Sequence, residues 1–177
     1  MEYYRGDTIG WSEVEASHDQ LDGGARGIWA GGNTPTRVNV IQYITISTLG
    51  NTTDFGDLNE VKEGGASCSS RTKAVFAGGY NGPSRTSNSS YIIMSSTGNG
   101  VDYNDLSNSI SGGAGFGSQT RGIIAGGWLY PTLYNIIDYV EIATTGNAVD
   151  FGDTTHGDST NGLVVNASGV SNAHGGL

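Results

Sequence analysis

Six aspartates form three matching pairs that could supply oxygen ligands to a hard cation. Each pair encloses an aromatic residue followed by glycine or asparagine, and the pairs are Asp54 and Asp57, Asp102 and Asp105, and Asp150 and Asp153. Carboxylates at this spacing could bind calcium. A dedicated calcium loop would bring more acidic residues within a dozen positions, and aspartate also accepts backbone N–H bonds in turns. The pattern favours turn capping, with a calcium site as the alternative.

A second group of residues combines aromatic rings with a cation, in segments rich in Asn, Ser and Pro. Its members are Tyr80, Arg85, Trp128, Tyr130 and Tyr134. Aromatic faces stack on sugar rings and anchor protein interfaces, although exposed aromatic residues also occur without a partner. We interpret these five residues as candidates for binding a ligand or a host surface.

The chain has no recognisable catalytic motif. His18, His156 and His174 have no metal-binding spacing, and the sequence has neither a nucleophile elbow nor a phosphate loop. Cys68 is the single cysteine, so it can form neither an intrachain disulfide nor a cysteine-based metal site. We therefore expect a non-enzymatic protein without a cofactor.

The candidate residues recur because the chain repeats itself about every 48 residues. Ala-Gly-Gly begins at Ala30, Ala77 and Ala125, and a tyrosine recurs at 43, 91 and 139. Self-similarity of this length is typical of folds in which each unit buries its apolar face against its neighbours. The sequence predicts a single domain made of a partial unit (1–25), three repeats (26–72, 73–120 and 121–168) and a closing partial unit (169–177).

Each repeat reads as strands joined by turns. A short apolar strand runs into the double glycine, where positive φ or close backbone approach would favour glycine. A polar loop follows, and then an alternating strand, a Gly-Asn turn, the Asp-aromatic strand and a Gly/Ser-rich return. The loops cover 33–39, 80–89 and 128–135, and we expect them on one face of the molecule. The fold class is all-β with four-stranded repeats.

Composition and charge exclude several functions. The chain has 30 glycines, 14% charged residues and a formal net charge of −9. An acidic chain without clustered cations is a poor partner for nucleic acid. The first 20 residues have no apolar core of signal-peptide length, and no apolar run is long enough for a membrane helix. We expect a soluble protein made in the cytoplasm, with no membrane insertion.

The repeat resembles the kelch-type β-propeller blade, a four-stranded sheet of about 50 residues. More narrowly, the segments 121–127 and 137–153 are similar to repeats in virion proteins of marine tailed phages that infect cyanobacteria. The resemblance covers 26–153. It implies a phage virion structural protein, displayed on the capsid or tail as a decoration or tail-fibre module. Implied partners are other virion proteins and a host surface glycan.

The number of repeats leaves the closure of the fold open. Closed single-chain propellers generally have four to eight blades, and this chain has three with partial units. Either chains associate, which predicts a homo-oligomer or docking on a larger assembly, or three units close alone in a β-trefoil-like or β-prism-like fold. An alternative function is a carbohydrate-binding, lectin-like module.

Overall fold

The computed structural model describes residues 26–155 and 166–171. This part of the chain is all-β, as predicted, and contains no helix and hence none that could cross a membrane. The predicted partial unit 1–25 lies outside the described residues, and the closing unit 169–177 is described only to residue 171.

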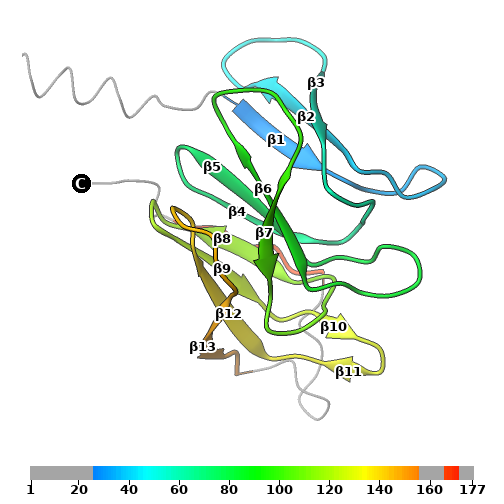
Figure 1. The fold of residues 1–177 in the computed structure, drawn as a ribbon, viewed down its shortest axis with the longest axis vertical. Helices are drawn as coiled ribbons and strands as arrows, with labels where there is room; N and C mark the ends of the chain where they lie inside the picture. The colour runs from blue at the N-terminus through cyan, green and yellow to red at the C-terminus, as the bar shows by residue number, and fades with distance from the viewer. Residues whose placement is uncertain (1–25, 156–165, 172–177) are drawn as a thin grey trace, which may run out of the picture.

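Three antiparallel sheets follow one another along the chain (Figure 1). The first sheet contains β1 (Arg26–Ala30), β2 (Val40–Thr45) and β3 (Thr53–Asp57). The second contains β4 (Ala66–Ser69), β5 (Lys73–Ala77), β6 (Asn88–Ile93) and β7 (Val101–Asp105). The third contains β8 (Ala114–Gly117), β9 (Arg121–Ala125), β12 (Ile136–Glu141) and β13 (Val149–Asp153). A hairpin of β10 (Trp128–Leu129) and β11 (Thr132–Leu133) lies in the loop between β9 and β12.

The sheets are offset from the predicted repeats by one strand. The segment expected to be a Gly/Ser-rich return contains β4 in one repeat and β8 in the next, and each pairs with the strand that follows it. The second and third sheets therefore have the predicted four strands, with the first strand of each lying in the preceding sequence repeat.

The core lies between the faces of neighbouring sheets. Ile41, Phe55 and Leu58 of the first repeat pack against Ala74, Phe76 and Ile92 of the second sheet. The opposite face of the second sheet packs in the same way against Ile124, Val140 and Ile142 of the third sheet. The second sheet is thus covered on both faces, and each interface uses positions related by the repeat.

A β-bulge recurs at the same place in all three sheets. It shifts the register between the two central strands at Ile41/Gln42, Ser89/Ser90 and Ile137/Asp138. The inserted residue is the aromatic residue of the Asp-aromatic station, and the next residue has a positive φ of 146° at Gly56, 102° at Asn104 and 141° at Gly152. Since bulges re-aim side chains, these stations serve to direct Phe55 and Tyr103 into the interfaces rather than to close turns.

Each sheet also carries a stack of one cation and two rings. The cation lies over a tyrosine ring, at 4.8 Å for Arg26 and Tyr43, 4.7 Å for Lys73 and Tyr91, and 4.6 Å for Arg121 and Tyr139. The tyrosine ring meets the bulge aromatic edge-on, with centroids 5.9, 6.0 and 6.1 Å apart in the three sheets. Such contacts add stabilisation beyond the buried area.

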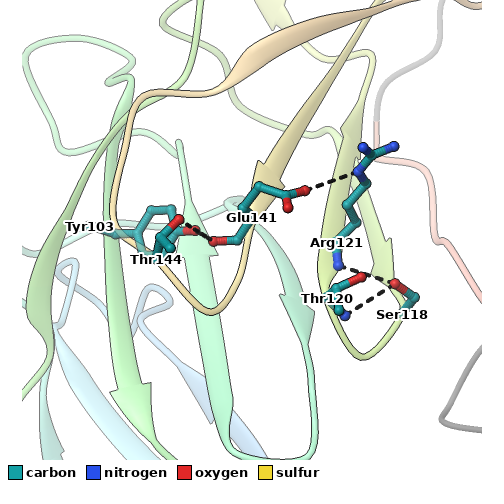
Figure 2. A network of polar contacts seen from close by, with 6 residues as sticks. All are labelled: Tyr103, Ser118, Thr120, Arg121, Glu141 and Thr144. Carbon is teal, nitrogen blue, oxygen red and sulfur yellow. Dashed lines mark hydrogen bonds and ion pairs between the residues drawn. The ribbon is translucent and has the colours of Figure 1, made fainter.

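These cations connect the sheets through backbone carbonyls. Arg26 Nη1 donates to the Met94 carbonyl at 2.7 Å, and Lys73 Nζ donates to the Ala143 carbonyl at 3.0 Å. The sequence suggested aspartates of the neighbouring repeat as their partners, and this expectation was wrong. Arg121 instead pairs with Glu141 of its own sheet at 3.0 Å, and the Glu141 carbonyl accepts the Tyr103 hydroxyl of the second sheet at 2.6 Å (Figure 2).

The double glycines hold the positive φ that the sequence predicted. Gly78 has a φ of 65° and Gly79 of 117°, and the other two stations repeat this conformation. The Gly79 amide donates to the Ile110 carbonyl at 2.7 Å. A Cβ at Gly78 would lie 2.7 Å from that carbonyl oxygen, so the turn needs glycine both for its conformation and for the close approach.

Candidate functional site

The three polar loops converge, as the repeat predicted. The Arg37 guanidinium of the first loop lies 4.4 Å from the Tyr80 ring centroid of the second loop. The Arg85 guanidinium of the second loop lies 3.8 Å from the Trp128 ring centroid of the third loop. Arg37 and Arg85 are 48 residues apart, as are Tyr80 and Trp128, so the same contact forms twice.

Backbone pairing fixes the two rings at the start of their loops. Tyr80 exchanges two backbone hydrogen bonds with Glu63, at 2.8 and 3.1 Å. Trp128 pairs with Ser111 in the same way, at 3.0 and 3.2 Å. Glu63 and Ser111 lie just before the first strand of the second and third sheets, so the strands position both rings directly.

We call this row of alternating cations and rings the arginine–aromatic ladder; it consists of Arg37, Tyr80, Arg85, Trp128 and Tyr130. Arg85 contacts Tyr80 as well, at 5.0 Å, and Trp128 meets Tyr130 edge-on at 6.2 Å. A planar guanidinium stacks well on an aromatic face, and each contact is worth about 0.5–2 kcal/mol. The ladder therefore holds its side chains in place in the absence of a ligand.

The two arginines of the ladder differ in their polar partners. Arg37 Nη2 forms an ion pair with Glu63 Oε1 at 2.7 Å. Arg85 Nε donates to Ser111 Oγ at 3.2 Å, and Arg85 pairs with no carboxylate among the residues that the structure describes. Arg85 thus contributes a guanidinium whose charge is not neutralised within the described part of the chain.

The ladder forms the wall of a cavity of about 690 Å³ between the second and third loops. Apolar surface comes from aromatic rings and from Pro131 and Leu133, and polar groups come from Glu63, Arg85, Ser111 and Asn166. A concave site with apolar walls and a few fixed polar groups is the usual form of a small-ligand site. Tyr130 stands at the cavity with its ring largely exposed.

Four of the five predicted binding residues line this cavity, namely Tyr80, Arg85, Trp128 and Tyr130. Tyr134 is the exception and requires a correction, because it is partly buried and packs against the core between the second and third sheets. Its amide also donates to the Gly127 carbonyl at 2.9 Å, which places it at the base of the loop.

Two contributors to the site, Arg37 and Glu63, were not singled out from the sequence. The signal for Arg37 is present in the repeat, since it lies one period before Arg85. Glu63 has no such signal, because the equivalent residue in the next repeat is Ser111. Only the backbone pairing with Tyr80 brings Glu63 into the site.

The six repeated aspartates lie on the outer strands, away from the ladder. Asp102 accepts a hydrogen bond from Asn88, Asp105 from Ser87, and Asp150 from the Gly152 amide at 3.2 Å. The Asp150 contact is the local backbone capping that the sequence predicted. Within 26–155 and 166–171, no three His, Cys, Asp or Glu side chains are grouped so that they could hold a metal ion.

Comparisons with known proteins identify a similar fold and no family. No protein-family model matches the chain, and no curated protein sequence is similar to it. Among solved structures, a protein called YjhT superposes with a TM-score of 0.59 and 14% sequence identity, over 76% of this chain and 42% of YjhT. At this identity the likeness concerns the fold alone. The chain spans less than half the length of YjhT.

Proposed function

We propose that the chain is a non-enzymatic structural module of a phage virion, a capsid decoration or tail-fibre protein that contacts the host surface. Its three sheets are blades of a kelch-type β-propeller. The proposal is supported by the 48-residue repeat, by sheets that pack face to face in chain order, and by the similarity of 121–153 to virion repeats. The protein is made in the host cytoplasm and is displayed on the virion beside other virion proteins.

The observation that carries the contact with the host is the cavity beside the arginine–aromatic ladder. A sugar ring has apolar faces that stack on aromatic side chains, and its hydroxyls need hydrogen-bond partners at the ring edge. Tyr130 and Trp128 supply the faces, and Arg85, Ser111 and Asn166 supply polar groups around them. Because the ladder already holds these side chains in place, binding costs little ordering of the protein. The ligand class is a host surface glycan.

A glycan array tests the recognition step with a matched pair of variants. Tyr130→Ser removes an exposed ring at the cavity, and Leu49→Ser removes an exposed side chain on the β2–β3 turn, so neither change should affect folding. We expect the parent and Leu49→Ser to bind the same glycans, and Tyr130→Ser to bind them roughly tenfold more weakly or worse. Equal binding by Tyr130→Ser and the parent would place recognition elsewhere.

Gold-labelled antibodies against the chain, applied to purified phage particles, test the location. The proposal predicts label on the capsid or on the tail. A carbohydrate-binding, lectin-like protein that is not part of the particle is the second candidate, and the same cavity favours it. Glycan binding by the purified chain without any label on particles would support that second candidate.

A further inference from the structure

The third sheet has an open face, meaning a face that no other sheet of the described residues covers. Its bulge residue Phe151 is 56% exposed, whereas the equivalent Phe55 is 2% exposed and Tyr103 is 1% exposed. Phe55 and Tyr103 are each covered by the following sheet. Phe151 retains the ring contact with Tyr139 and the cation Arg121 above it. The third sheet thus presents the same docking surface as the first two without a covering sheet.

The first sheet has the complementary open face. Ile46 is 66% exposed, while its equivalent in the third repeat, Ile142, is 1% exposed against the second sheet. Trp29 is 44% exposed, while its equivalents Phe76 and Ile124 are 9% and 1% exposed. These positions are the ones that the second and third sheets place against the sheet before them.

Polar contacts between sheets also leave one matching group at each end. Asn99 Oδ1 accepts from the Asp57 amide of the preceding sheet at 3.1 Å, and Asn147 Oδ1 accepts from the Asp105 amide at 3.4 Å. One repeat further in either direction, the series has Asn51 on the first sheet and the Asp153 amide on the third. Arg121 likewise has no carbonyl acceptor on a following sheet within the described residues, unlike Arg26 and Lys73.

The segment 166–171, drawn in red in Figure 1, begins the next unit of the series. The Gly112 amide donates to the Gly64 carbonyl at 2.7 Å, and the Asn166 amide donates to the Gly112 carbonyl at 2.6 Å. Asn166 therefore follows Gly112 as Gly112 follows Gly64, with a spacing of 54 residues instead of 48. In this register Val170, which is 92% exposed, takes the place of Cys68, which is 5% exposed.

We propose that two copies of this chain associate head to tail, with the open face of the third sheet of each copy docked on the open face of the first sheet of the other. The segment 166–171 of one copy then lies beside β1 of its partner, where β1 has no neighbouring strand among the described residues. Two copies supply six sheets, within the four to eight that propellers use, and a head-to-tail contact that closes in this way forms a ring.

The proposal rests on the propeller arrangement proposed above and is independent of what the cavity binds. Native mass spectrometry of the full chain should give twice its 18.3 kDa. Phe151→Asp and Ile46→Asp, one at each open face, should each raise the dissociation constant of the pair at least tenfold. Leu49→Asp is the control, because Leu49 is fully exposed and its equivalents Thr97 and Thr145 stay exposed beside their neighbouring sheets.

Mixing the two interface variants distinguishes a head-to-tail contact from a symmetric one. A pair formed by one Phe151→Asp chain and one Ile46→Asp chain has one doubly altered interface and one intact interface. We therefore expect mixed pairs to form more readily than either variant pairs with itself. A monomeric parent, any stoichiometry other than two, sensitivity to one of the two variants only, or no gain on mixing would overturn the proposal. Glycan binding, measured separately, reports on the cavity alone.

Discussion

Lys62 shows how far the repeat tolerates a chemical exception at one residue. It is buried at the position that Ile110 occupies in the next repeat, and its ammonium donates to the Asn88 carbonyl at 3.0 Å. Burial lowers the pKa of Lys62 to about 8, against the opposing influence of Glu60 and Asp102. An unfolded lysine holds its proton up to about pH 10.4. Between these values the unfolded chain binds more protons than the folded one, so this group's contribution to stability rises with pH.

Lys62→Met should therefore stabilise the protein at pH 7. An apolar side chain already fills the equivalent site, and the Asn88 carbonyl keeps its bond from the Gly78 amide at 3.1 Å. We expect a gain on the order of 1–3 kcal/mol in the free energy of unfolding. Denaturant titrations at several pH values should show this gain shrinking between about pH 8 and pH 10. A gain of constant size would contradict the role assigned to Lys62 burial.

At the scale of the elements, the double-glycine turns hold the second strand of each sheet against the following segment. Gly78→Val would combine a positive φ of 65° with a Cβ close to the Ile110 carbonyl oxygen. We expect a loss of roughly 2 kcal/mol or more in stability. The matched control is Gly146→Val, because a Cβ at Gly146 meets nothing within 4 Å. Thermal unfolding of the two variants should separate clearly, and equal melting temperatures would mean that the turn tolerates a side chain.

The strands that were predictable from sequence are those with β-branched and aromatic alternation, such as β2, β6 and β12. The strands β4 and β8 were missed because close packing, not β propensity, selects their residues. A Cβ at Gly115 would collide with the Ser67 carbonyl, and a Cβ at Gly122 would collide with Cys68 Sγ. Small residues are required there, and in the sequence they resemble a loop. The six-residue shift before Asn166 was hidden for a related reason, since the segment matches the repeat only in its contacts.

The candidate site could be predicted in part because it inherits the period of the strands. Equivalent loop positions had to share a face, and aromatic and cationic residues on them had to meet. Which ring belonged to the core could not be predicted, because Tyr130 and Tyr134 have the same type and lie in the same loop. The hairpin β10–β11 decides between them by exposing Tyr130 and turning Tyr134 toward the core.

At the scale of the whole molecule, the stacked sheets separate the two kinds of surface. The loop face carries the arginine–aromatic ladder and its cavity, and the two ends of the stack carry the open sheet faces. An assembly through the ends leaves the loop face accessible. A virion module of this kind can pack against itself and contact the host at the same time.

The most direct test of the account is an NMR titration that observes the indole N–H signals of the ¹⁵N-labelled chain. The chain has three tryptophans, and Trp→Phe variants assign each signal. Trp128 lines the cavity, whereas Trp29 lies on the open face of the first sheet. With a fragmented surface polysaccharide from the host cell as the probe, we predict a saturable shift of the Trp128 signal and an unchanged Trp29 signal. A Trp128 signal that stays in place while the polysaccharide binds, or an absence of binding, would contradict the account.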